Sequence, residues 1–188
     1  MKARKNIGNY LLYEKIGSGC FAEVYRAIKN TDSNSPNPKQ FAVKCIPKSK
    51  IESIPSLLKC HRNEINIMHQ INHPHLLHLY DYYQTKNNFY LVLDYCEGGD
   101  LESYLQKNHV RYLKEKEALD VIYGVLKGFK KLRTFNIIHK DLKLSNLFLR
   151  NKKIVIGDFG LSSIGKEMNN ETMGTALNMA PELFEDNC

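Results

Sequence analysis

The first half of the chain alternates short apolar runs with polar turns, a pattern that predicts β-strands. Residues 30–40 are rich in Asn, Ser and Pro and are predicted to form a loop, because these residues favour turns. Apolar side chains at helical spacing predict one helix over residues 57–71. The predicted strands occupy residues 10–16, 23–28, 41–46, 76–83 and 88–96.

The second half changes to a helical pattern. One long helix is predicted in this half. Short apolar pieces follow it at residues 146–149 and 153–160, and the paired glycines of CEGGDL (residues 96–101) indicate a linker before it. A strand-rich part followed by a helix-rich part predicts two lobes joined near residue 96. The face of the long helix is defined by apolar residues three or four positions apart, at Ala118, Ile122, Val125, Phe129 and Leu132.

Composition narrows the class of protein. The 188 residues contain no apolar run near the roughly 18 residues of a membrane span, and the basic start lacks the apolar region of a secretory signal. The five cysteines are widely spaced without a CxxC pair, which favours a reduced, cytoplasmic protein. The net charge of +7 comes from scattered lysines. It is better interpreted as a solvated basic surface than as a specific nucleic-acid site.

Two charged residues do not fit a plain core. Glu64 lies on the apolar stripe of helix 57–71, and Lys44 lies mid-strand on the face shared by Ala42 and Ile46. A charge on a core-facing position costs several kcal/mol unless it is paired. Each of the two could be the partner of the other. The alternative is that either side chain extends to solvent.

Two glycines stand in a predicted hairpin turn, GSGCFAEV, at Gly17 and Gly19. Without large side chains, such a turn can lay its backbone N–H groups against phosphates, although most glycine-containing hairpins are only turns. A strand follows the glycines here, which argues against a Rossmann or P-loop site, because those sites require a helix at this point.

Polar residues of catalytic type follow two buried-looking segments. HKDLKLSN (139–146) comes directly after an Ile-Ile pair, and Asp158 of DFG (158–160) ends the apolar run IVIG. A carboxylate at that position is a candidate ligand for Mg²⁺, although a strand-ending turn gives the same tripeptide. The histidines of HPHLLH do not share one strand face, which disfavours a zinc site.

Taken in chain order, GSGCFAEV, FAVK, Glu64, HKDLKLSN, DFG and APE (180–182) resemble the signature of the eukaryotic protein kinase family. The resemblance implies an α+β, bilobal fold. Its N-lobe, residues 10–95, would have a five-stranded antiparallel sheet and one main helix, after an N-terminal extension at residues 1–9. Residues 96–188 would form a mostly helical C-lobe that lacks the later helices of the family.

The resemblance also implies an activity, the transfer of the γ-phosphate of Mg·ATP to Ser or Thr hydroxyls of protein substrates. The lysine of DLKLSN resembles the Ser/Thr-specific branch. CEGGDL and GTALNMAPE weakly resemble the autophagy-initiating and calcium/calmodulin-dependent branches. Nothing in the sequence predicts the oligomeric state.

Site roles follow from the same resemblance. Asp141 would accept the proton of the substrate hydroxyl, Lys143 would neutralise the transferred group, and Glu64 would orient Lys44. Asn146 and Asp158 would hold Mg²⁺. The ATP-binding residues would be Ile16, Gly17, Gly19, Val24, Ala42, Lys44, Leu93, Asp94, Cys96, Asp100 and Phe148.

Two alternative functions stay open. A pseudokinase or inactive fragment could bind nucleotide or act as a scaffold, although the residues whose loss marks such proteins are all present. A small-molecule phosphotransferase of related fold is the second alternative, and APE and DLKLSN argue against it.

The chain departs from the family pattern in the activation segment. The family's HRD is HKD here, and Glu171, nine residues before Ala180, stands where many relatives carry a phosphorylated threonine. A lysine cannot reproduce the bidentate grip of arginine on a phosphate. We hypothesise that Glu171 pairs with Lys140 as a constitutive substitute. The alternatives are phosphorylation at Thr172, Ser162, Ser163 or Thr175, although Thr175 is expected beside Asp141.

This pairing hypothesis predicts that Glu171→Ala lowers the activity of phosphatase-treated protein. Unchanged activity of that variant would refute it.

Overall fold

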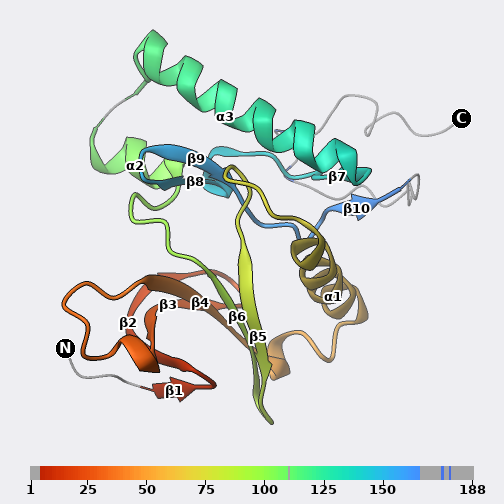
Figure 1. The fold of residues 1–188 in the computed structure, drawn as a ribbon. Coiled ribbons are helices and arrows are strands. Elements are labelled where there is room, and N and C mark those ends of the chain that lie inside the picture. Colours follow the sequence, from red (N-terminus) through yellow and green to blue (C-terminus); the bar gives the residue numbers. More distant parts are fainter. Residues whose placement is uncertain (1–4, 110, 166–174, 176–177, 179–188) are drawn as a thin grey trace, which may run out of the picture. The chain divides into compact units, whose positions relative to one another are not determined.

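The computed structural model describes residues 5–109, 111–165, 175 and 178 (Figure 1). The chain divides into two compact units. Residues 1–59 and 78–95 form the first, termed the sheet unit, and residues 60–77 and 96–188 form the second, termed the helical unit. The lobe limits inferred from the sequence, with a boundary at residue 95, stay a prediction.

The sheet unit is built on one antiparallel sheet with the strand order β1-β2-β3-β4-β6-β5 (Figure 1). Within the described residues it has six strands rather than the five predicted. The extra strand, β1, pairs with β2 from inside the predicted N-terminal extension. Its three residues bury only Ile7, too little for a visible pattern. The strands are β1 Lys5–Ile7, β2 Tyr10–Ser18, β3 Glu23–Lys29, β4 Gln40–Pro47, β5 Leu79–Gln84 and β6 Asn88–Asp94.

The two faces of this sheet carry different side chains. Alternation along β4 and β6 sends Phe41, Val43, Tyr90 and Val92 into the buried hydrophobic cluster of the unit. The intervening residues of both strands lie on the opposite face. Two short 3₁₀ helices, Asn30–Asp32 and Lys48–Lys50, flank β4.

The helical unit combines helices with two small strand pairs. Helix α3 packs against β9, and α2 packs against β8 (Figure 1). No helix in the described part of the chain is long and apolar enough to cross a membrane. The elements are α2 Leu101–Lys107, α3 Glu115–Thr134, a 3₁₀ helix Leu144–Asn146, the pair β8 Leu147–Arg150 with β9 Lys153–Ile156, and the pair β7 Ile137–Ile138 with β10 Ser163–Ile164. Helix α1, Pro55–Gln70, begins in the sheet unit and continues into this one.

Helix α3 buries only part of the face predicted for it. Its buried residues are Gly124, Gly128 and Leu132, and of these only Leu132 belongs to the predicted stripe. Ile122 of that stripe is 53% exposed. A Cβ on Gly124 would lie 3.1 Å from the His75 ring and from Ile154, so these glycines let α3 approach the strand closely. Glycine gives no hydrophobic signal, and the sequence pattern therefore placed the face one step around the helix.

The predicted strand 76–83 is also corrected. Strand β5 begins at Leu79, and the two leucines before it belong to the helical unit. Leu76 forms a parallel bridge with Ile156, and the Leu77 N–H donates to the Ile156 carbonyl at 2.8 Å. Both segments are apolar, so the pattern cannot show where the pairing partner changes.

The close packing of α3 predicts that Gly128→Ala destabilises the protein. A new Cβ would lie 2.6 Å from Ile156 Cδ1 and 3.2 Å from the His75 carbonyl oxygen, and Ile156 is fully buried with little room to move. Overpacking costs about 1–3 kcal/mol and should exceed the roughly 1 kcal/mol gained in helix propensity. Urea unfolding measures the change, with the exposed Asp120→Ala in the same helix as control. Equal or higher stability of Gly128→Ala would contradict the packing argument.

Candidate active site

His139 fixes the polar loop that follows β7. Its side chain is buried, and its Nε2 lies 3.0 Å from the Gly157 carbonyl oxygen. Its Nδ1 accepts a hydrogen bond from the Asp141 N–H at 3.3 Å. Burial lowers the pKa of His139, although the Gly157 carbonyl acts in the opposite direction. The ring is therefore a neutral imidazole that positions Asp141 rather than a general base.

Ser162 extends the same network, and nothing in the sequence pattern marked this role. Its buried hydroxyl donates to the His139 carbonyl at 3.1 Å. Its own carbonyl accepts a hydrogen bond from the Asn63 side chain of α1. Phe159 closes the arrangement with its ring 5.3 Å from the His139 ring, edge-on. Ser162 is thus a structural residue, and its burial disfavours it as a phosphorylation site.

Asp141 is a buried carboxylate with hydrogen-bond donors on both oxygens. Its Oδ1 accepts from the Thr175 hydroxyl at 2.7 Å and from the Thr175 N–H at 3.1 Å. Its Oδ2 lies 2.9 Å from Lys143 Nζ and accepts from the Asn146 amide at 3.0 Å. Lys143 Nζ also donates to the Thr175 hydroxyl at 2.9 Å, so the four residues form one closed cluster.

The charge state of Asp141 follows from these contacts. Burial raises the pKa of its carboxyl, but the hydrogen bonds from Lys143 and Thr175 and the charge of Lys143 outweigh burial and hold the pKa below its usual range. Asp141 is therefore ionised at neutral pH.

Asn146 and Asp158 carry the kinds of oxygen atom that a hard cation prefers as ligands. The Asn146 amide nitrogen donates to both the Asp141 carbonyl and carboxylate, at 2.8 and 3.0 Å, which leaves Oδ1 as its oxygen acceptor. Asp158 is exposed at the end of the buried strand β9 and has a positive φ of 61°. The Gly157 N–H, one residue earlier, donates to the Asn146 carbonyl and ties the two segments together. An amide oxygen and a carboxylate suit Mg²⁺, which usually completes its shell with phosphate and water oxygens.

The histidines considered for zinc are divided between the two units. His73 and His75 belong to the helical unit, and His78 belongs to the sheet unit. Over the residues that the structure describes, no group of three or more His, Cys, Asp or Glu side chains could hold a metal ion.

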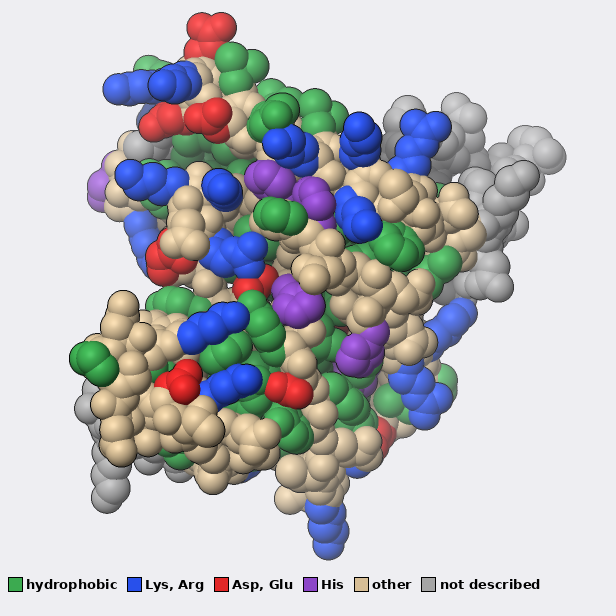
Figure 2. Space-filling view, viewed as in Figure 1, with side chains coloured by type: hydrophobic (Ala, Val, Ile, Leu, Met, Phe, Trp, Pro, Cys, Tyr) green, Lys and Arg blue, Asp and Glu red, His purple; other side chains and the backbone are tan. Residues whose placement is uncertain are grey.

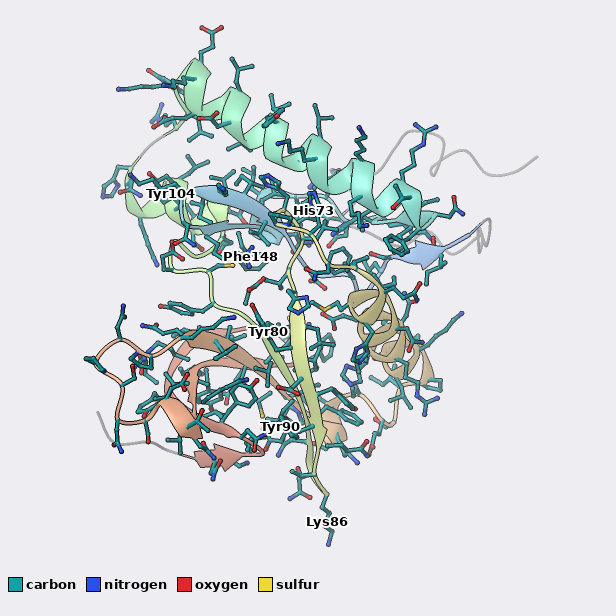
Figure 3. All side chains as sticks on the ribbon, in the orientation of Figure 1. His73, Tyr80, Lys86, Tyr90, Tyr104 and Phe148 are labelled. Atoms are coloured by element: carbon teal, nitrogen blue, oxygen red, sulfur yellow. The ribbon has the colours of Figure 1, made fainter. Side chains whose placement is uncertain are left out.

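Four more predicted residues belong to the helical unit. Phe148 lies on β8 and forms a bridge with Asp100 (Figure 3). The Asp100 carboxylate accepts from the Ser103 N–H at 2.8 Å and so caps helix α2. Cys96 is half-buried at the start of the linker, and its carbonyl accepts from the Gly99 N–H at 3.0 Å. Glu64 is buried on α1.

The sheet unit carries four of the remaining predicted residues on one face. The register pairs Val24 with Lys44, Ala42 with Leu93, and Lys44 with Leu91. Directly opposed residues of antiparallel strands project from the same face, so Val24, Ala42, Lys44 and Leu93 form one surface. This face lies opposite the hydrophobic cluster of the unit. Asp94 ends β6, where its side chain accepts from the Tyr80 hydroxyl at 2.9 Å and the His78 N–H at 3.1 Å.

The glycines of the β2–β3 turn are not needed by the turn itself. Gly17 pairs with Val24, and Ile16 beside it is exposed. Neither Gly17 nor Gly19 has a positive φ, and a Cβ on Gly19 would meet nothing within 4 Å. The Gly19 N–H donates to the Ala22 carbonyl at 2.8 Å. Because a side chain would fit at both positions, the glycines leave open space above the loop backbone.

The structure describes only some of the residues predicted for the activation segment. Glu171, Thr172 and the APE motif lie outside the described residues. Thr175 lies against Asp141, as the cluster distances show.

The His139 network predicts opposite effects for two neighbouring serines. Ser162→Ala removes the donor to a buried carbonyl and should cost about 1–2 kcal/mol of unfolding free energy. Ser163 is the matched control, since its buried hydroxyl has no hydrogen-bond partner among the described residues and Ser163→Ala should be neutral or slightly stabilising. Urea unfolding of both variants tests this, and equal losses would show that Ser162 has no special role.

Comparison with known proteins places these motifs in a family. Residues 10–188 match the protein kinase domain. The chain is 35% identical over 185 residues to the serine/threonine-protein kinase RUNKEL of Arabidopsis thaliana, covering 96% of this chain and 12% of that protein.

Two further relatives give the same result. Serine/threonine-protein kinase ATG1c of Arabidopsis thaliana is 35% identical over 185 residues, covering 95% of this chain and 24% of that protein. Serine/threonine-protein kinase PLK4 of Xenopus laevis is 37% identical over 173 residues, covering 89% of this chain and 18% of that protein. The chain thus spans less than a quarter of the length of each of these relatives. It belongs to the eukaryotic protein kinase family, and within it to the serine/threonine type.

Proposed function

We propose that this chain carries the catalytic residues of an ATP-dependent serine/threonine kinase that phosphorylates protein substrates. The observation that carries the proposal is the cluster around Asp141, in which an ionised carboxylate, an ammonium group and a threonine hydroxyl lie within hydrogen-bond distance of one another. Family membership supports the same activity, although the relatives are much longer proteins.

In this proposal, Asp141 orients the substrate hydroxyl. Its low pKa makes it a weak base, so it holds the hydroxyl in line and accepts the proton late in the transfer. Such positioning supplies most of the rate in phosphoryl transfer. The Thr175 hydroxyl already donates to Asp141 at 2.7 Å, which shows that the carboxylate can accept a hydrogen bond from a hydroxyl group.

Lys143 and the cation site are proposed to stabilise negative charge. The Lys143 ammonium, 2.9 Å from Asp141, would neutralise the charge on the transferred phosphoryl group. Asn146 and Asp158 would hold Mg²⁺, whose positive charge offsets that of the phosphates when it is bound. Lys44 would contact the phosphates, oriented by Glu64.

The remaining predicted residues are proposed to bind the nucleotide. The apolar face formed by Val24, Ala42 and Leu93 suits an adenine ring, and Phe148 is proposed as a further adenine-binding residue. The backbone of Asp94 and Cys96 would bind the adenine edge, with Asp100 near the ribose. The open space above Gly17 and Gly19 would admit the phosphates to the backbone N–H groups.

The direct test is transfer of labelled γ-phosphate from Mg·ATP to a Ser/Thr peptide library. Asp141→Asn should lower kcat by about 10²–10⁴-fold, because the hydroxyl loses its proton acceptor. The exposed Asp120→Asn on α3 is the control and should keep full activity. Nucleotide binding without any transfer by the unsubstituted protein would instead favour a pseudokinase. Labelling of small alcohols but not of peptides would favour a small-molecule phosphotransferase.

The contact between Lys143 and Asp141 predicts a change in pH dependence. Transfer requires the ionised carboxylate, so activity falls as the pH drops through the pKa of Asp141. Lys143 lowers that pKa, and Lys143→Met should therefore move the acid limb of the kcat/KM profile to higher pH. Lys116→Met on the exposed surface of α3 should leave the limb in place. A lower activity of Lys143→Met with an unmoved acid limb would contradict the assigned coupling.

The protein substrate is defined only as one with an accessible Ser or Thr. A cytoplasmic location remains a prediction from the sequence.

A further inference from the structure

A basic hollow of about 450 Å³ lies in the helical unit, and its lining includes none of the residues proposed for catalysis. Figure 3 labels His73 beside α3, and Figure 2 shows histidine side chains among lysine and arginine side chains on this face. No acidic side chain is among the lining residues. The charged and titratable residues that line it are His73, His75, Lys127, Lys130, Lys131 and Lys153.

The histidine side of the hollow is held by the fold. His75 Nδ1 lies 2.7 Å from the Ile154 carbonyl oxygen on β9, and the His75 N–H donates to His73 Nδ1 at 3.2 Å. Gly124 and Gly128 bring α3 against this segment, since a side chain at either position would crowd His75. The same glycines therefore bring the lysines of α3 next to the two imidazoles.

The lysine side of the hollow is costly for the helix. Lys127, Lys130 and Lys131 are spaced three and four residues apart on one face of α3, where like charges destabilise a helix. Among the described residues, none of these three lysines forms an ion pair. Lys127 Nζ lies 4.2 Å from the ring centroid of Tyr123, and Lys131 Nζ lies 4.8 Å from that of Phe135. The helix dipole also favours Lys131, in the last turn. Neither ring carries a full negative charge, so the repulsion among the three lysines is not neutralised.

The electrostatics of His73 agree with a concentration of positive charge. Burial lowers its pKa first, followed by repulsion from His75, Lys131 and Lys127. A bound anion would relieve this repulsion and offset the helix penalty.

We propose that this hollow binds a compact ligand carrying several phosphate groups. Its volume lies within the roughly 300–1,000 Å³ of small-molecule sites and is much larger than one phosphate needs. Lysines bind phosphate as point charges, and two imidazoles can add hydrogen bonds. The concave shape suits a compact polyphosphate better than an extended phosphopeptide. Such a ligand could be a soluble inositol polyphosphate or the headgroup of a phosphoinositide lipid.

The test compares binding of inositol hexakisphosphate to the full 188-residue chain and its variants by titration calorimetry. K127Q/K130Q/K131Q should weaken binding at least tenfold. K107Q/R111Q/K116Q removes the same charge elsewhere in the helical unit and should change binding less than twofold. K127R/K130R/K131R keeps the charge and should bind within about threefold of the unsubstituted protein, which separates the role of charge from damage to the helix. Lys44→Met should bind normally, which excludes the nucleotide site.

Two further probes distinguish the sources of the ligand. If the source is a lipid, the protein should bind phosphatidylcholine vesicles that contain 5% phosphatidylinositol 4,5-bisphosphate, and the glutamine variant of the α3 lysines should lose this binding. If the protein binds no vesicles but binds inositol hexakisphosphate tightly, the ligand is a free polyphosphate. The proposal is overturned if both glutamine triple variants lose binding equally, if Lys44→Met abolishes binding, or if a doubly phosphorylated peptide binds more tightly than inositol hexakisphosphate.

Discussion

The buried His139 side chain is the contact on which the rest of the candidate site depends. One ring nitrogen lies within hydrogen-bond distance of the Gly157 carbonyl oxygen, and the other accepts a hydrogen bond from the Asp141 N–H. The His139 carbonyl accepts a hydrogen bond from the Ser162 hydroxyl. These bonds join the loop that carries Asp141 and Asn146 to the segment that carries Asp158. A neutral ring is required for this pattern, since one nitrogen must accept while the other donates. Burial, which lowers the pKa of His139, keeps the ring neutral.

Charge is compensated differently in the Asp141 cluster and in the basic hollow of the helical unit. Around Asp141, an ammonium group, a hydroxyl and an amide compensate one buried carboxylate, so the site is neutralised before any ligand arrives. The basic hollow is lined by six groups that can carry positive charge and, within the described part of the chain, by no carboxylate. The first arrangement explains how the buried Asp141 carboxylate stays ionised. The second leaves an electrostatic cost that an anion would remove.

Much of this organisation can be predicted from sequence, because its signals are local. The alternation in FAVKCI placed Ala42 and Lys44 on one strand face, and the register of β3, β4 and β6 adds Val24 and Leu93 to that face. Contacts that depend on the tertiary fold could not be predicted. Ser162 reaches the His139 carbonyl from 23 residues away, and no pattern marks it. Gly124 and Gly128 set the buried face of α3 by having no side chain, and a hydrophobic periodicity cannot register that.

The central claim, that these residues build a Mg·ATP site, is tested most directly by the melting temperature of the chain with and without Mg·ATP. Lys44→Met and Asp158→Asn are compared with Lys86→Met, a residue exposed in the turn between β5 and β6. At 100 times Kd, binding adds about 2.7 kcal/mol, which corresponds to a rise of several degrees. The account predicts this rise in the unsubstituted protein and in Lys86→Met, and its loss in the other two variants. An equal rise in Asp158→Asn, or no rise in any form, would contradict it.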